Sequence, residues 1–213
     1  MTDARKPATT GNADMAVVYI VDDDPSIREA LVDLFLSVRT DAKAFESAQQ
    51  LLDTADLERP GCILLDVRLP GGNGLDLQAH LEKLGNRMPI IFMTGHGDIP
   101  MTVRAMKAGA VDFLAKPFRD QDILDAVSLA LQRDREQREQ SAANGAVADL
   151  ARTLTRREHE VMAAVVKGLM NKQIAFNLGI SEITVKLHRG NVMRKMEARS
   201  VADLVRKAEL LGL

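Results

Sequence analysis

The sequence predicts two domains, an α/β domain with a five-stranded parallel sheet and then a small all-α domain. Apolar runs typical of buried strands alternate five times with helical patterns over about 115 residues, which predicts helices on both faces of a parallel sheet. Residues 1–150 hold 16 Lys and Arg against 24 Asp and Glu, a net charge of −8, whereas residues 151–213 hold 12 against 6, a net charge of +6. Opposite charges indicate two domains with different partners, and the basic one favours nucleic acid.

Bulk composition excludes several classes of protein. The 213 residues are 46% apolar, which is enough for two modest cores. The lone Cys62 lies inside an apolar run, so no intramolecular disulfide can form. No apolar stretch reaches the roughly 18 residues that a membrane span needs. Residues 1–15 are polar and lack the apolar core of a signal peptide, so we expect a disordered tail and a cytoplasmic protein.

The strands of the first domain are expected at Val17–Val21, Ala42–Phe45, Cys62–Leu65, Pro89–Met93 and Val111–Ala115. Helices are expected from Pro25, from Ser47 to about Asp56, around Leu75–Leu84, over Pro100–Lys107, and from about Asp120 into Leu131. A Gly-rich loop is expected after the central strand. Five such units fit the flavodoxin-like strand order 2-1-3-4-5, with a ligand crevice between strands 1 and 3.

The division of the chain follows from these patterns. We expect a tail at 1–15, the α/β domain at 16–130, a helical linker at 131–150 and the all-α domain at 151–213. In the linker, the polar run 132–140 extends the last helix, and the small residues 141–145 predict a loose segment. Whether the extension pairs with a second copy as a coiled coil stays open.

Four helices are predicted in the all-α domain. Thr155 and Glu158 form a capping box, and the helix that they open runs to about Lys167. Further helices are expected over Asn171–Leu178, from Ser181 through Met196, and from Ser200 onward. Two short helices joined by a tight turn at Gly179 are typical of a helix-turn-helix.

Polar residues stand where the predicted strands end. Asp22 and Asp23 follow the first strand, Asp66 closes the central one, and Thr94 and Lys116 close the last two. In a parallel sheet these ends face one edge, where three carboxylates repel one another unless a cation joins them. Mg²⁺ suits such a site, Lys116 adds a charge for a phosphate, and an Asp can form an aspartyl phosphate. Taken alone, Asp66 could equally cap the next turn.

In this order and spacing, these residues resemble the receiver domain of bacterial response regulators over about residues 16–130. The resemblance implies that Asp66 accepts a phosphoryl group from the phosphohistidine of a sensor histidine kinase. It implies Mg²⁺ or Mn²⁺ on Asp23, on Asp66 and on the backbone carbonyl of Arg68, with Asp22 acting through water. Residues 94–101 and 106–113 look closer still to the FixJ subgroup.

Three further roles come from the same resemblance. Thr94 and Lys116 bind the transferred phosphoryl group, and Phe113 changes rotamer together with Thr94. Phosphorylation favours a homodimer through the fourth helix and the fifth strand. The candidate dimer residues are Ile99, Met101, Val103, Arg104, Lys107 and Asp112.

The second domain resembles the four-helix DNA-binding domain of the LuxR/FixJ/NarL class over about residues 152–213, through Leu154-Thr155, Asn171-Lys172 and Thr184-Val185-Lys186. A helical wheel on 184–196 independently places Val185, Val192 and Met196 on a core face, with His188 at its edge. The opposite face is polar and basic, as expected for a helix that lies in the major groove. The candidate DNA contacts are Lys172, Thr184, Lys186, Leu187, Arg189, Gly190, Asn191, Arg194 and Lys195. Lys172 and Lys195 are assigned to phosphates. Gly190 departs from relatives that carry a larger side chain there.

The combined prediction is a transcription factor that phosphorylation of Asp66 activates, with double-stranded promoter DNA and RNA polymerase as partners and no membrane association. Such a protein catalyses only its own phosphoryl transfer and dephosphorylation. A haloacid-dehalogenase-like phosphotransferase is the alternative enzyme, but that class needs an Asp where Arg68 stands. A non-catalytic interaction module is the third reading. Against it stand the intact Asp22, Asp23, Thr94 and Lys116.

Overall fold

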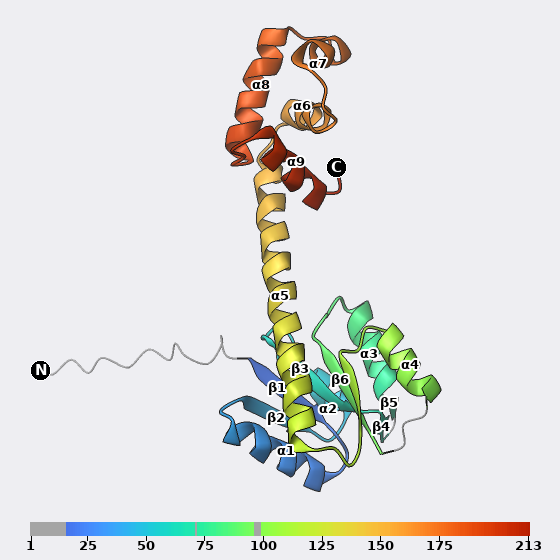
Figure 1. The fold of residues 1–213 in the computed structure, drawn as a ribbon. Helices are drawn as coiled ribbons and strands as arrows, with labels where there is room; N and C mark the ends of the chain where they lie inside the picture. The colour runs from blue at the N-terminus through green and yellow to red at the C-terminus, as the bar shows by residue number, and fades with distance from the viewer. Residues whose placement is uncertain (1–15, 71, 96–98) are drawn as a thin grey trace, which may run out of the picture. The chain divides into compact units, whose positions relative to one another are not determined.

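The computed structural model describes residues 16–70, 72–95 and 99–213. The predicted tail at residues 1–15, and residues 96–98 of the FixJ-like stretch, lie outside the described residues. The chain forms two compact units, divided between Gln137 and Arg138 (Figure 1). Among the helices that the structure describes, none is both long enough and apolar enough to cross a membrane.

The first unit is built on a five-stranded parallel sheet. Its strands are β1 (Val17–Val21), β2 (Asp41–Phe45), β3 (Gly61–Asp66), β6 (Ile90–Thr94) and β7 (Asp112–Ala115). They lie in the order β2-β1-β3-β6-β7, which confirms the predicted order 2-1-3-4-5. Every residue of β1, β3 and β6 is buried, as continuous apolar runs in a doubly covered sheet require.

Helices cover both faces of this sheet (Figure 1). They are α1 (Pro25–Ser37), α2 (Ala48–Thr54), α3 (Gly74–Lys83), α4 (Ile99–Lys107) and the first part of α5 (Asp120–Arg152). Side chains of β1 alternate between two apolar clusters, so that Tyr19 joins one and Ile20 the other. The cluster of Tyr19 includes Leu51 of α2 and Leu77 of α3, whereas that of Ile20 includes residues of α1 and α5.

Two local predictions were wrong. The loop expected after the central strand contains a two-stranded antiparallel pair, β4 (Arg68–Leu69) and β5 (Gly72–Asn73). The loose segment expected at residues 141–145 is helical, because α5 continues through it to Arg152. Ala is the best helix former, and Val147 and Ala151 of the last turns enter the core of the second unit, so Gly145 does not end the helix.

The second unit is all-helical, as predicted. Beyond the end of α5 it contains α6 (Arg156–Val166), α7 (Asn171–Leu178), α8 (Glu182–Lys195) and α9 (Val201–Leu210). Thr155 and Glu158 make the predicted capping box at the start of α6. Between α7 and α8, Gly179 adopts φ 63°, a left-handed conformation that glycine accepts without strain. This turn produces the helix-turn-helix.

Candidate functional site

The strand register brings the polar strand ends of the first unit together. Val21 lies beside Leu65, so the next residues, Asp22 and Asp66, are neighbours at the carboxyl edge of the sheet. The Lys116 backbone N–H donates to the carbonyl of Thr94 at 2.7 Å, which places the last two strand ends side by side. The acidic and phosphate-binding residues expected from the sequence therefore share one edge.

Lys116 links the two buried carboxylates. Its Nζ lies 2.5 Å from Asp22 Oδ2 and 2.5 Å from Asp66 Oδ2. The second oxygens are also held, since Asp22 Oδ1 accepts from the backbone N–H of Asp24 at 3.0 Å and Asp66 Oδ1 from that of Arg68 at 2.9 Å. Both acidic side chains thus have fixed orientations before any ligand arrives.

Burial and charge pull the pKa values of this site in opposite directions. Burial raises the pKa of Asp22 by more than the hydrogen bonds from Lys116 and from the Asp24 backbone lower it. Burial alone lowers the pKa of Lys116, but hydrogen bonds to Asp22 and Asp66 outweigh it and leave that pKa raised. The ammonium group therefore stays protonated near neutral pH.

The carboxylates also form a candidate metal site. Asp22, Asp23 and Asp66 each present an oxygen, and these three oxygens lie within 4.8 Å of one another. Asp23 is exposed, so the cluster opens to water on one side. Mg²⁺ binds through one or two carboxylates and keeps several waters, and this donor set fits it. One ammonium group cannot balance three carboxylates, which leaves a negative charge for a cation to offset.

The residues expected to respond to a phosphoryl group lie on β6 and β7, two neighbouring strands of the sheet. Thr94 is buried at the end of β6. Phe113 is half-buried on β7, opposite Phe92 in the register, and the two ring centroids are 6.3 Å apart. Arg68, whose carbonyl is a predicted metal ligand, begins β4 two residues after Asp66. The three roles stay predictions.

The predicted dimer residues divide into three groups. Val103, Arg104 and Lys107 are exposed on α4. Met101 packs partly against the core, and Asp112 accepts a hydrogen bond from the backbone N–H of Phe113 at 2.7 Å. The side chain of Ile99 lies outside the described part of the chain. Met106, which is not in the predicted set, is also exposed on α4.

In the second unit, α8 separates its two faces as the helical wheel predicts. Val185, Val192 and Met196 are buried in the core. Lys186, Leu187, Gly190 and Arg194 are exposed, and Asn191 is half-buried. The exposed face of α8 is therefore available to a ligand, and Lys172 on α7 is exposed as well. Ile183, which precedes the residues of the helical wheel and is not among the predicted contacts, is 83% exposed.

Three of the predicted DNA contacts already bind groups inside the domain. Lys195 Nζ lies 2.6 Å from Glu158 Oε2 and 2.9 Å from the carbonyl oxygen of Thr153. Arg189 Nη1 donates to Asn171 Oδ1 at 2.8 Å. The Thr184 hydroxyl lies 2.8 Å from that of Ser181, the N-cap of α8. We therefore assign Lys195 a stabilising role inside the domain and leave it out of the DNA contacts proposed below.

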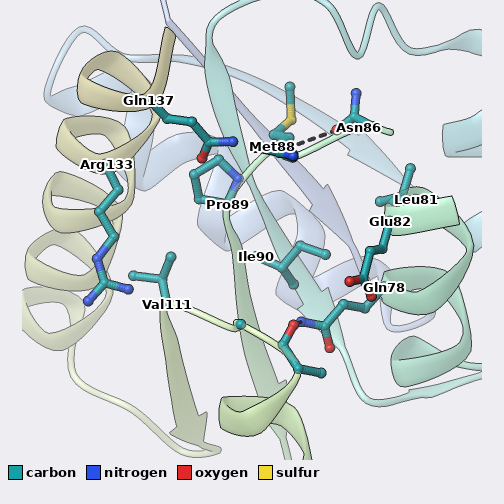
Figure 2. Close-up of a pocket in the computed structure, with 13 residues that line it drawn as sticks. Gln78, Leu81, Glu82, Asn86, Met88, Pro89, Ile90, Val111, Arg133 and Gln137 are labelled. Carbon is teal, nitrogen blue, oxygen red and sulfur yellow. Dashed lines mark hydrogen bonds between the residues drawn. The ribbon is translucent and has the colours of Figure 1, made fainter. Parts of the chain in front are cut away.

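A separate cavity of about 380 Å³ lies at the opposite edge of the sheet. Figure 2 shows Pro89 and Ile90 at the start of β6, with Gln78 of α3 on one side and Arg133 of α5 on the other. Gln78 Nε2 donates to the carbonyl of Ala108 at 2.7 Å across this region. Asp22, Asp23 and Asp66 are not among the residues that line the cavity, so it is distinct from the candidate site.

Comparison with known proteins agrees with this geometry. The family model of response regulator receiver domains matches residues 18–128, and that of the luxR family of bacterial regulatory proteins matches residues 152–208. Nodulation protein W of Bradyrhizobium diazoefficiens is 55% identical over 198 residues, 93% of this chain and 87% of that protein. Response regulator protein TodT of Pseudomonas putida is 45% identical over 209 residues, 96% of this chain and 92% of that protein.

Solved structures show the same relationship. The response regulator StyR is 46% identical and superposes with a TM-score of 0.80, covering 92% of this chain and 98% of that one. Full-length FixJ from B. japonicum is 38% identical, with a TM-score of 0.57 over 92% of this chain and 97% of that one. The resemblance inferred from the sequence motifs is confirmed. The chain belongs to the response regulators that join a receiver domain to a LuxR-type DNA-binding domain, and it is a regulator of transcription.

Proposed function

We propose that Asp66 accepts a phosphoryl group from the phosphohistidine of a sensor kinase, and that this phosphorylation activates promoter binding. The observation that carries the proposal is the shared contact of Lys116 with Asp22 and Asp66 at the carboxyl edge of the sheet. A protonated ammonium group beside a solvent-open carboxylate cluster is suited to hold a phosphoryl group there.

The chemistry assigned to Asp66 is an in-line displacement. A carboxylate oxygen of Asp66 attacks phosphorus, the P–N bond to the kinase imidazole breaks, and the departing nitrogen takes up a proton. Mg²⁺ held by Asp23, Asp66 and the backbone carbonyl of Arg68, with Asp22 acting through water, would neutralise charge on the phosphoryl oxygens. The residues of the chain orient the acceptor, because the Arg68 backbone N–H and Lys116 each hold one of its oxygens.

Lys116 is expected to link phosphorylation of Asp66 to a change in the conformation of the receiver domain. In the structure its ammonium group is shared between two carboxylates. A phosphoryl group on Asp66 adds competing oxygens, so we expect Lys116 to turn toward them. We expect the Thr94 hydroxyl, at the end of the neighbouring strand β6, to donate to the same group. Movement of Thr94 toward the phosphate would open space for Phe113, the half-buried aromatic on the neighbouring strand.

The output proposed for this change is a homodimer through α4 and β7. Val103, Met106 and Lys107 are exposed on α4 and offer an apolar surface with a basic rim. Two joined chains would present two copies of α8 to half-sites on double-stranded DNA. The proposed DNA contacts are Lys172, Lys186, Leu187, Gly190, Asn191 and Arg194, with Thr184 and Arg189 held in place by neighbouring side chains.

A haloacid-dehalogenase-like phosphotransferase is disfavoured by what stands two residues after Asp66. That class places a second carboxylic acid there to protonate the leaving group, whereas this chain has Arg68, whose side chain is exposed. Without that acid the phosphoryl group is expected to persist on Asp66, which suits a signal better than turnover.

The test is labelling by acetyl phosphate with Mg²⁺, followed by mass spectrometry of the intact chain. The chain should gain one phosphoryl group, and Asp66→Asn should gain none. Asp24→Asn is the matched control, because Asp24 caps α1 through its side chain and Asn caps equally well. Control protein should label like the unaltered chain, and chelation of Mg²⁺ should abolish labelling. Equal labelling of Asp66→Asn, or labelling that survives chelation, would overturn the assignment.

A further inference from the structure

The exposed face of α8 has an unusual composition at its N-terminal end. Ile183 is 83% exposed and Leu187 is 64% exposed, and the two lie one helical turn apart. Gly190 and Arg194 continue the same stripe at spacings of three and four residues. The stripe therefore runs from two large apolar side chains, through a glycine, to a cation.

Local stability does not explain this arrangement. The core face of α8 is formed by other residues, with Val185 and Val192 buried. Ile is a poorer helix former than Leu, Lys or Glu, so it is not favoured at an exposed position of a first turn. Neighbouring large apolar side chains left in water usually mark an interaction site.

Docking geometry identifies which part of DNA these side chains meet. A recognition helix places its N-terminal residues against base edges in the major groove. Ile183 and Leu187 have no donor or acceptor, and the C5-methyl of thymine is the group there that apolar side chains contact. A Cβ built at Gly190 has no neighbour within 4 Å, so this part of the helix surface is open for close approach to the bases.

We propose that Ile183, together with Leu187, reads thymine methyl groups in the half-site, and that Ile183 is a specificity-determining residue of this domain. The inference rests on the proposed DNA binding and adds the chemistry of the bases. The four residues from Ile183 to Leu187 rise about 6 Å along the helix axis. Base pairs rise about 3.4 Å, so the two thymines should lie within two base steps of each other. Hydrogen-bonded readout is left to Asn191 and Arg194, farther along the helix.

The experiment replaces thymine by deoxyuridine, which pairs identically but lacks the methyl group. A duplex is first selected from a random pool by the full chain with Mg²⁺ and acetyl phosphate. Each thymine of that duplex is then exchanged singly, and affinity is measured. The affinity of the unaltered chain should fall about fourfold when thymine is exchanged at either of two positions, which is the factor expected for the loss of one buried methyl group. Ile183→Ala should bind the parent duplex more weakly and lose discrimination at one position only, and Leu187→Ala should lose it at the other.

Two further readouts separate base reading from a structural or protein-docking role. The salt dependence of binding should be the same for Ile183→Ala as for the unaltered chain, because no phosphate contact is removed. Phe176→Ala is the matched control, since Phe176 is 88% exposed on α7, outside this stripe. It should keep the full uracil penalty at both positions, because Phe176 is not part of the stripe that is proposed to read the thymines.

The possible outcomes separate failure of thymine reading from failure of the proposed DNA binding. Selection that enriches no sequence would overturn specific DNA binding, and the inference with it. Specific binding that is indifferent to uracil at every position would overturn the inference alone. So would an Ile183→Ala variant that keeps both penalties, which would assign the apolar pair to a protein partner.

Discussion

Glu158 should stabilise the DNA-binding domain mainly through its charge. Glu158 Oε2 accepts from Lys195 Nζ at 2.6 Å and from the backbone N–H of Thr155 at 2.8 Å, and the side chain is buried. These bonds, that from Lys195 foremost, lower the pKa of Glu158 to about 2. The variant Glu158→Gln removes the charge but can still accept from Thr155 and complete the capping box.

The free energy that the Glu158 charge contributes to stability follows from the lowered pKa of this side chain. The depression from 4.5 to about 2 corresponds to about 3 kcal/mol at 1.36 kcal/mol per unit. Solvent screens part of this energy because the Lys195 side chain is 23% exposed, so we expect Glu158→Gln to cost about 2 kcal/mol at pH 7. The folded pKa lies below the unfolded one. The stabilisation is therefore complete above the unfolded pKa of 4.5 and is lost as pH falls toward 2.

Hydrogen exchange of the full chain, read by mass spectrometry on peptides from α6 and α8, measures the free energy of opening of this domain. The unaltered chain should lose protection between pH 4.5 and pH 2, and Glu158→Gln should lose less over the same range. Glu160→Gln is the control, because Glu160 pairs with Arg157 at the surface and its removal should change little. Equal protection of Glu158→Gln and the unaltered chain at pH 7 would refute the reasoning.

Three further predictions concern the dimer, the stability of α8 and the recognition of DNA. Val103→Glu should prevent the phosphorylation-dependent dimer while leaving labelling of Asp66 intact; sedimentation velocity with acetyl phosphate checks this, and a dimer of unchanged strength would exclude α4 from the interface. Gly190→Ala should raise the free energy of unfolding of the second domain by about 1 kcal/mol, since Ala is the better helix former and the added Cβ meets open space; hydrogen exchange in α8 measures it, and unchanged or weaker protection would contradict the prediction. Lys172→Ala should weaken binding to operator and random DNA about equally and flatten the salt dependence by about one phosphate, whereas Asn191→Ala should reduce discrimination by roughly 1–3 kcal/mol. Equal loss for both variants on both kinds of DNA would contradict the groove assignment of α8.

Much of the receiver site could be predicted from the sequence because it depends on local pattern and on parallel topology. An apolar run followed by Asp66 predicts a buried strand that ends in a carboxylate, and parallel strands place all such ends at one edge. Helix starts such as Asp24 and Thr155 were equally predictable, since a cap bonds to backbone only two or three residues away.

The tertiary structure alone decided which charged groups are engaged. Lys195 resembles a DNA contact in sequence, but its ammonium group meets Glu158, 37 residues earlier, because α6 and α8 pack together. The continuity of α5 through Gly145 likewise depends on Val147 and Ala151 entering a core that later helices form. Conversely, the exposure of Ile183 is known only once Val185 and Val192 occupy that core. Sequence patterns determine which residues can bury or bond, whereas packing between distant segments determines which of them do.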